Sequence, residues 1–368
     1  MRILFLCASL EHGRDGVGDY TARLATELRS RGHGCLCAAI DDCHLERDAG
    51  ENGFFRGADF FRLSRMKSWF ERIEILRKEA SEFRPDWVSL QFVPHGFHPK
   101  GLPLLLPSRL ALIGGGFGWH IMFHELWIEP RGRWSNHIIS KLQKFLVGEL
   151  CRKLRPRVIQ TSNPYYGTRL RREGIACEIL PLFENIGVYP SFAEHRPEEW
   201  TFVFFGSLRP GWDLHPLLER IESARAVSGK TRCRFVSIGR LGAFGESAWM
   251  AMQKNAPGSF IFERRGELSS EAVSRELQSA DFGIAAAPFH LLGKSGAVAA
   301  MRAHGLPVIV SRFQTEYSGP DRSARPALVL LDGSFEKNLC SAEKVPCRET
   351  LPEIAGIFLN SLAGAALN

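Results

Sequence analysis

The chain alternates short apolar segments of strand length with longer segments in which apolar residues recur at helical spacing. Residues 3–7 form the first apolar run and residues 34–40 the next, with one helical segment between them. Strands that alternate with helices in this way predict parallel sheets joined by right-handed crossovers. The pattern starts again near residue 200, with a strand at 201–205 and a helix capped by Asp213. We therefore expect an α/β protein with two Rossmann-like, doubly wound domains.

The length of the chain agrees with two domains, because 368 residues exceed what one hydrophobic core usually supports. A segment rich in proline and charge, residues 189–200, separates the two series. We predict four regions: an N-terminal domain over 1–186, a linker over 187–200, a C-terminal domain over 201–345, and a C-terminal helix over 346–368 that we allow to pack back towards the N-terminal domain.

Three features predict a cytoplasmic protein without disulfides or a metal centre. No apolar run approaches the roughly 20 residues that cross a bilayer, and Met1 leads directly into a strand without a signal-peptide pattern. The nine cysteines are odd in number and contain no CxxC pair, as expected of reduced thiols.

The net charge of +7 lies mainly in the first half, where residues 1–190 hold 27 Lys and Arg against 21 Asp and Glu. A basic face suits a phosphate-bearing substrate or an anionic surface. The basic residues are dispersed and lack a nucleic-acid-binding motif, so we expect no nucleic acid partner. Peripheral contact between the N-terminal domain and the inner face of the membrane stays open.

Residues 54–82 mix aromatic and basic side chains, and Leu63, Met66, Phe70 and Ile73 fall on one helical stripe. The plainer interpretation is an amphipathic helix with a solvated basic face. The sharper one is a surface that lies on anionic lipid or holds an anionic acceptor.

Two loops in the first half carry candidate site residues, because ligands of open α/β sheets bind beyond the carboxyl ends of the strands. Gly16, Val17 and Gly18 follow the first strand, where their amides could cradle an anion or simply form a tight turn. His124 and Glu125 follow a later strand. This histidine could bond a sugar hydroxyl or a developing charge, or it could be a core or capping residue.

A third loop, in the second half, opens a helix with Lys294, Ser295 and Gly296. A lysine charge, a hydroxyl and backbone amides at a helix N-terminus suit a pyrophosphate. A simple N-terminal cap would need only the serine.

These loops, in this order, resemble the retaining GT-B glycosyltransferases of family 4. The resemblance covers about residues 1–330, and its motifs are residues 16–33, 85–91, 123–125, 204–209, 279–284 and 300–308. It implies two domains facing an interdomain cleft, with a nucleotide-diphosphate sugar held by the second domain and the acceptor by the first.

The resemblance also implies the reaction and the roles of the residues. The reaction is metal-independent transfer of a hexose, with retention, from the nucleotide sugar as co-substrate to a hydroxyl of a glycan or lipid-linked acceptor, without a cofactor. The implied residues are His124 and Glu125 for catalysis; Gly16, Val17, Gly18, Arg209, Lys294, Ser295 and Gly296 for the donor diphosphate; and Asp19, Tyr20 and Gln91 on the acceptor side.

Four positions depart from the family pattern. The arginine and lysine that follow the first strand of the family's donor domain align with Ser207 and Trp212, with Arg209 nearby as a substitute. The glutamates of its E-x7-E pair align with about Leu292 and with Ala300. This difference motivates an alternative, a catalytically inactive glycosyltransferase-like protein that binds a ligand or partner. A GT-B sugar-nucleotide epimerase is a third possibility, although we find no convincing set of acid and base carboxylates for it.

Overall fold

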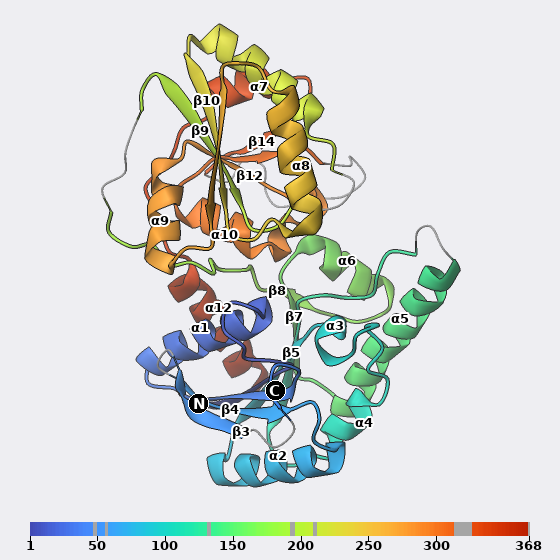
Figure 1. Cartoon of the computed structure of the whole chain (residues 1–368). Coiled ribbons are helices and arrows are strands. Elements are labelled where there is room, and N and C mark those ends of the chain that lie inside the picture. Colours follow the sequence, from blue (N-terminus) through green and yellow to red (C-terminus); the bar gives the residue numbers. More distant parts are fainter. Residues whose placement is uncertain are drawn as a thin grey trace. The chain divides into compact units, whose positions relative to one another are not determined.

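The computed structural model describes residues 1–46, 50–55, 58–130, 134–191, 196–208, 212–312 and 326–366. The chain divides into two units, coloured along the sequence in Figure 1. Unit 1 comprises residues 1–162, 166–181 and 351–368, and unit 2 comprises residues 163–165 and 182–350. Residues 187–200, the predicted linker, thus group with unit 2, and the last helix groups with unit 1.

Unit 1 is built on an eight-stranded sheet in the order β3-β4-β2-β1-β5-β6-β7-β8, parallel except for the antiparallel pair β3–β4. Its strands are β1 (Arg2–Cys7), β2 (Gly34–Asp42), β3 (Gly50–Phe55), β4 (Ala58–Ser64), β5 (Trp87–Phe92), β6 (Gly118–Phe123), β7 (Val158–Thr161) and β8 (Glu178–Ile179). Its helices are α1 (Gly16–Ser30), α2 (Trp69–Phe83), α3 (Pro94–Phe97), α4 (Leu106–Ala111), α5 (Trp134–Leu154), α6 (Pro164–Arg172, whose first two residues belong to unit 2) and α12 (Leu351–Ala366).

The C-terminal helix α12 completes one face of this sheet, and Figure 1 shows it beside α1. The Phe358 ring on α12 stacks on the Phe5 ring of β1 with the centroids 6.0 Å apart. Arg31, after α1, donates a hydrogen bond to the Pro352 carbonyl at 2.5 Å. The last residues of the chain therefore cover apolar strands formed by the first.

The stripe predicted over residues 63–73 as one helix is wrong. Leu63 lies in β4, which pairs with β2, and the helix starts only at Trp69. A capping box sets this start: Ser68 Oγ accepts from the Glu71 amide, and the Glu71 carboxylate accepts from the Ser68 amide. Met66 and Phe70 are consequently 64% and 77% exposed instead of forming a buried face.

Unit 2 repeats the architecture with a six-stranded, all-parallel sheet in the order β11-β10-β9-β12-β13-β14. Its strands are β9 (Glu199–Phe205), β10 (Arg232–Ile238), β11 (Phe260–Gly266), β12 (Phe282–Ile284), β13 (Val308–Val310) and β14 (Leu328–Leu330). Its helices are α7 (His215–Ser228), α8 (Gly242–Asn255), α9 (Ser270–Ser279), the 3-10 helix η1 (Phe289–Lys294), α10 (Gly296–Ala303) and α11 (Phe335–Ser341).

Stacked aromatic rings form the core of unit 2. The Phe202 ring on β9 lies 5.1 Å from the Phe235 ring of β10 and 5.2 Å from the Phe282 ring of β12. Asp213, predicted as the cap of the next helix, instead accepts from the His215 amide, and Leu214 occupies the cap position of α7.

Within the described residues, no helix combines the length and the apolar character that a membrane crossing requires. The nine cysteines are all free; Cys7, Cys35, Cys37 and Cys233 are buried, whereas Cys43, Cys340 and Cys347 are exposed.

Candidate functional site

Both sheets contain a point where the strand order reverses direction. In unit 1 this point lies between β1 and β5, and in unit 2 between β9 and β12. At such a switch point the loops after the two strands diverge, which leaves a crevice for a ligand beyond the carboxyl ends. Residues in the loops that follow these four strands are therefore candidate site residues.

The glycine loop follows β1, as predicted, but two of its three amides are already engaged. Residues 16–18 form the first turn of α1, and the Asp15 carboxylate accepts from the amides of Val17 at 2.9 Å and Gly18 at 3.0 Å. Burial raises the pKa of Asp15, while these two hydrogen bonds oppose the rise. A diphosphate would have to displace this carboxylate, so contact between the donor and residues 16–18 stays a prediction.

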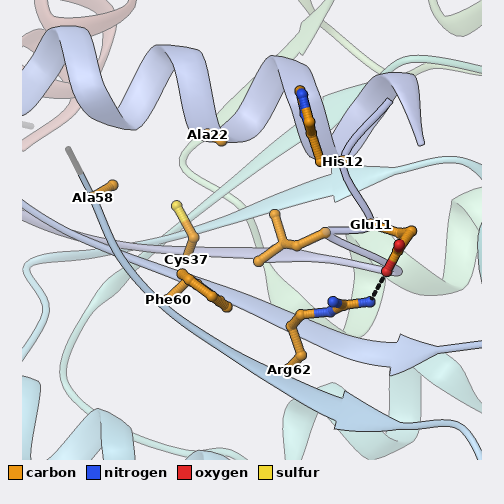
Figure 2. Close-up of a pocket in the computed structure, with 8 residues that line it drawn as sticks. Glu11, His12, Ala22, Cys37, Ala58, Phe60 and Arg62 are labelled. Atoms are coloured by element: carbon orange, nitrogen blue, oxygen red, sulfur yellow. Dashed lines mark hydrogen bonds and ion pairs between the residues drawn. The ribbon is translucent and has the colours of Figure 1, made fainter. Parts of the chain in front are cut away.

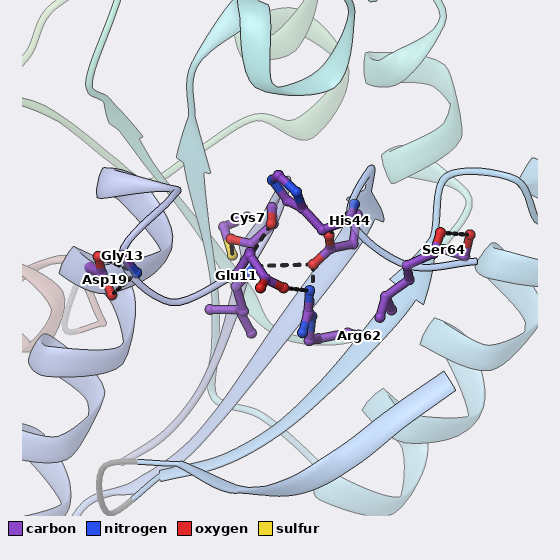
Figure 3. Close-up of polar contacts among 11 residues, drawn as sticks. Cys7, Glu11, Gly13, Asp19, His44, Arg62 and Ser64 are labelled. Carbon is purple, nitrogen blue, oxygen red and sulfur yellow. Dashed lines mark hydrogen bonds and ion pairs between the residues drawn. The ribbon is translucent and has the colours of Figure 1, made fainter. Parts of the chain in front are cut away.

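Asp19, predicted on the acceptor side, holds the same loop from inside the helix. Its carboxylate lies 2.8 Å from Nδ1 of His12. It also accepts from the Gly13 amide at 3.2 Å (Figure 3). In this structure Asp19 therefore orders the loop that precedes α1.

His124, Gln91 and Tyr20 come together at the carboxyl end of the unit 1 sheet. His124 follows β6, and its Nε2 lies 2.9 Å from Oε1 of Gln91, near the end of β5. The Tyr20 ring of α1 meets the His124 ring edge-on at 4.8 Å. Burial raises the pKa of Tyr20, so its hydroxyl stays protonated at neutral pH. Glu125 is half-buried beside this group.

A chain of hydrogen bonds, buried except at its last bond, runs from His124 across the four strands β5 to β8. Gln91 Nε2 donates to Ser89 Oγ at 2.7 Å, and Ser89 Oγ lies 2.8 Å from Nδ1 of His120. Nε2 of His120 lies 3.2 Å from Oε1 of Gln160, whose amide donates to the Glu178 carboxylate at 3.2 Å.

The carboxylate end sets the direction of every bond in this chain, because Glu178 can only accept. Gln160 must present its amide nitrogen to Glu178 and its oxygen to His120, so Nε2 of His120 carries the proton. Nδ1 of His120 then accepts from Ser89, which accepts from Gln91. The Gln91 oxygen therefore faces a protonated Nε2 on His124.

Burial keeps the His120 ring neutral, and helix α12 contributes to that burial. The side chain is fully buried, and burial lowers the pKa of His120 to about 3 against a weaker opposing effect from Gln160. The Phe358 ring of α12 meets the His120 ring edge-on at 5.2 Å, and Ser361 of the same helix donates to Glu178 at 2.7 Å.

A second polar group, not singled out from the sequence, joins the loops after β1 and β2 to strand β4. Arg62 contacts Glu11 at 2.5 Å and Asp42 at 2.8 Å, and Asp42 also accepts from the amides of Leu10 and His44 (Figure 3). Burial alone would raise the pKa of Asp42, but these hydrogen bonds outweigh it and the pKa is lowered. The only sequence signal was a polar residue at the end of each strand.

A cavity of about 230 Å³ adjoins this group on the α1 side. Figure 2 shows Glu11, His12 and Arg62 at one side and Cys37 and Phe60 at the other. The cavity combines an apolar wall with charged groups, as small-molecule sites commonly do.

In unit 2 the predicted phosphate loop lies where expected, after β12 and at the start of α10. Ser295 is the N-cap of α10, and its hydroxyl accepts from the Val298 amide at 3.3 Å. Lys294 ends η1 and is half-buried, and Gly296 begins the helix. The serine therefore has its capping role in this structure, and phosphate binding by the loop stays a prediction. Arg209 lies outside the described residues.

The two positions of the missing acidic pair are part of the core. Leu292 is 3% exposed and Ala300 is not exposed, and both pack in one apolar cluster of unit 2. His304, in the predicted donor signature, donates from Nδ1 to the Ala300 carbonyl at 2.7 Å, and its Nε2 lies 2.8 Å from Ser274 Oγ. Both ring nitrogens of this histidine are thus used inside the protein.

No protein-family model matches the chain, and no curated protein matches its sequence. Solved structures do match: the two parallel-sheet α/β domains are those of the GT-B fold, which is the fold class expected from the sequence.

Three of these structures illustrate the likeness. The chain is similar to a lipopolysaccharide outer core galactosyltransferase, WaaB (TM-score 0.56, 14% identity, covering 100% of this chain and 99% of that one). It is similar to an α,α-trehalose 6-phosphate synthase from Burkholderia multivorans (0.58, 11%, 100% and 99%). It is also similar to a UDP-GlcNAc 2-epimerase from Methanocaldococcus jannaschii (0.52, 10%, 99% and 100%). Identities this low establish the fold alone.

Proposed function

We propose that this protein is a retaining, metal-independent glycosyltransferase that moves a hexose from a nucleotide-diphosphate sugar to a hydroxyl of a glycan or lipid-linked acceptor. The proposal is supported by the fold together with the position of one loop in that fold. The full-length structural matches include a galactosyltransferase and an α,α-trehalose 6-phosphate synthase, and the loop at Lys294 and Ser295 opens a helix just beyond the switch-point strand β12.

The chemistry of that loop suits a leaving diphosphate. The N-terminus of α10 carries the positive end of the helix dipole, and Lys294 adds a full charge. Such groups stabilise the negative charge that develops as the bond to the sugar breaks. The proposal therefore assigns to this chain's own cationic groups the role that a divalent cation has in metal-dependent transferases.

On the acceptor side the proposal gives His124 a defined role. The His124 ring, oriented by its bond to Gln91, is assigned contact with a hydroxyl of the donor sugar or of the acceptor. Gln91 then acts as a positioning residue. Tyr20 packs against the His124 ring, and Asp19 orders the loop before α1.

One specific observation favours a second candidate, a ligand-binding protein without transferase activity. The E-x7-E positions are filled by Leu292 and Ala300, which are too deeply buried to contact a substrate. An epimerase is a third candidate, since a UDP-GlcNAc 2-epimerase has the same fold.

A single screen separates the three candidates. The purified protein is incubated with UDP, GDP and ADP sugars, with and without a panel of glycan and lipid-linked acceptors, and the nucleotide and sugar products are quantified. Acceptor-dependent release of nucleoside diphosphate supports transfer, and an epimerised sugar without acceptor supports the epimerase. Saturable binding with no product across the panel supports the inactive protein and contradicts the proposal.

A further inference from the structure

A second cavity of unit 1, of about 390 Å³, gathers three arginines. Arg65, Arg72 and Arg109 line it together with Asp41 and Trp69, and we call it the arginine pocket. Asp41 belongs to β2 and Arg65 follows β4, so two carboxyl strand ends meet here. Three guanidinium groups against one carboxylate leave an excess of positive charge.

That single carboxylate is already engaged. Asp41 accepts from Arg72 at 2.6 Å and from Arg65 at 3.1 Å. The Ile40 carbonyl accepts from Arg72 at 3.0 Å, and the Gly96 carbonyl accepts from Arg65 at 2.7 Å. These bonds hold two guanidinium groups in place without neutralising the third.

Arg109, on α4, is the arginine of the pocket that does not contact Asp41. Its guanidinium lies 4.6 Å from the centre of the Trp69 ring, and the Arg72 guanidinium lies 3.9 Å from the same ring. Among the residues that the structure describes, no hydrogen bond or ion pair engages the Arg109 guanidinium, and Nε of the 4% exposed Arg72 has no hydrogen-bond partner. Burial and the charge of Arg72 lower the pKa of Arg109, which an anion in the pocket would reverse.

His98 adds a further donor to the wall of the pocket. Its Nδ1 accepts from the amides of Lys100 at 3.1 Å and Leu102 at 3.3 Å. The proton of the neutral ring is therefore on Nε2. The polar lining thus consists of donors, plus one carboxylate that is already paired, which is what an oxyanion requires.

Apolar side chains surround the charged centre. Leu104 and Leu105 line the pocket and are 39% and 60% exposed. Exposed apolar residues grouped around a cationic centre match an amphiphile whose head is anionic, because membrane surfaces combine both features.

We propose that the arginine pocket binds the phosphate of an anionic lipid headgroup, with Arg109 as the main contact and Leu104 and Leu105 entering the acyl boundary. Arginine suits this role because its planar donors match phosphate oxygens. The pocket would hold unit 1 at a lipid surface. This inference extends the proposed function but does not depend on it, because lipid binding can be measured without a nucleotide sugar.

The test is co-sedimentation of the full chain with vesicles of phosphatidylcholine alone or with one quarter phosphatidylglycerol. We expect binding only to the anionic vesicles, and about five- to tenfold weaker binding for Arg109→Gln, as one basic contact contributes about 1 kcal/mol near such a surface. Lys78→Gln on α2, whose side chain is 72% exposed, removes the same charge outside the pocket and should bind as the wild type does. Leu105→Ser should also weaken binding to the anionic vesicles. The unfolding midpoints of all three variants should match that of the wild type.

Three outcomes would overturn the proposal. Equal losses for Arg109→Gln and Lys78→Gln would mean that diffuse charge, and not the pocket, attracts the vesicles. Millimolar inorganic phosphate could raise the unfolding midpoint of the wild type but not of Arg109→Gln, while neither protein binds vesicles. That result would assign the pocket to a soluble phosphate. Binding to neither probe would mean that the pocket is no anion site.

Discussion

Nε2 of His124 donates to Oε1 of Gln91 across 2.9 Å, and this bond belongs to a chain of hydrogen bonds anchored at the Glu178 carboxylate. One acidic residue at the far edge of the sheet thereby determines which nitrogen of His124 is protonated. The relationship links a candidate site residue to the packing of the C-terminal helix, because Ser361 of α12 also bonds Glu178.

Gln91→Leu should release His124 from this tautomer. With no acceptor opposite Nε2, the proton can occupy either ring nitrogen, and transfer activity should fall about tenfold through kcat, as one lost hydrogen bond would cause. The ¹⁵N spectrum of labelled protein should show altered His124 ring nitrogens. Gln253→Leu, at an exposed position of α8, controls for the substitution itself. Unchanged His124 signals in Gln91→Leu would contradict the proposed coupling.

His120 should make the protein less stable as the pH falls. Its pKa is lowered from 6.5 to about 3 in the folded state, so below pH 6.5 the unfolded chain takes up a proton that the folded chain refuses. Stability is then lost by up to about 1.4 kcal/mol per pH unit between pH 6.5 and 3, and is fully present above 6.5. Burial lowers the pKa of His304 also, which adds to the same trend.

Unfolding midpoints measured from pH 7 to 4.5 check this prediction. His120→Gln should lower stability at pH 7 but flatten the pH dependence, whereas His215→Gln, whose side chain is 67% exposed, should leave the slope as in the wild type. Parallel curves for His120→Gln and the wild type would show that His120 does not titrate between the two states.

Lys294→Ala should weaken binding of nucleoside diphosphates and their sugars by one to two orders of magnitude, because it removes a charge-assisted contact to the diphosphate. Calorimetry with UDP, GDP and ADP sugars measures the effect. Lys254→Ala, in the last turn of α8, is the control of equal charge. Equal affinities for the two variants would remove Lys294 from the donor site.

Gly18→Ala should destabilise unit 1 by about 1–3 kcal/mol, the usual cost of an overpacked position. A Cβ at Gly18 would lie 2.5 Å from the Ser9 carbonyl oxygen, so the first turn of α1 could not approach the loop after β1. At Gly16 a Cβ would meet nothing within 4 Å, and Gly16→Ala should be neutral or slightly stabilising. Urea unfolding of both variants tests the pair, and equal midpoints would show that the contact at Gly18 relaxes freely.

Much of the architecture could be predicted from the sequence because the signals are local. Residues 3–7 and 282–286 are runs of apolar residues and glycine of strand length, and strands β1 and β12 lie there. Helix caps are local in the same sense: the Ser269 hydroxyl accepts from the Ala272 amide at 3.2 Å, three residues along the chain. The fold class followed from the order of these elements.

Where local signals competed, the sequence misled. The helical spacing of Leu63, Met66 and Phe70 was real but accidental, because the register of β4 against β2 placed Leu63 in a strand and left the other two exposed. Backbone pairing with a strand some 20 residues earlier outweighs a short periodic pattern.

By itself the sequence determined which segments become strands and helices, and hence which loops lie at the carboxyl ends of the sheets. Only the tertiary structure decided that Ser89, His120 and Gln160 would adjoin across neighbouring strands, and that Arg65, Arg72 and Arg109 would share one pocket. The reason is physical. Periodicity reflects which face of its own helix or strand a residue occupies, whereas a chain of hydrogen bonds or a charged pocket depends on which segments become neighbours.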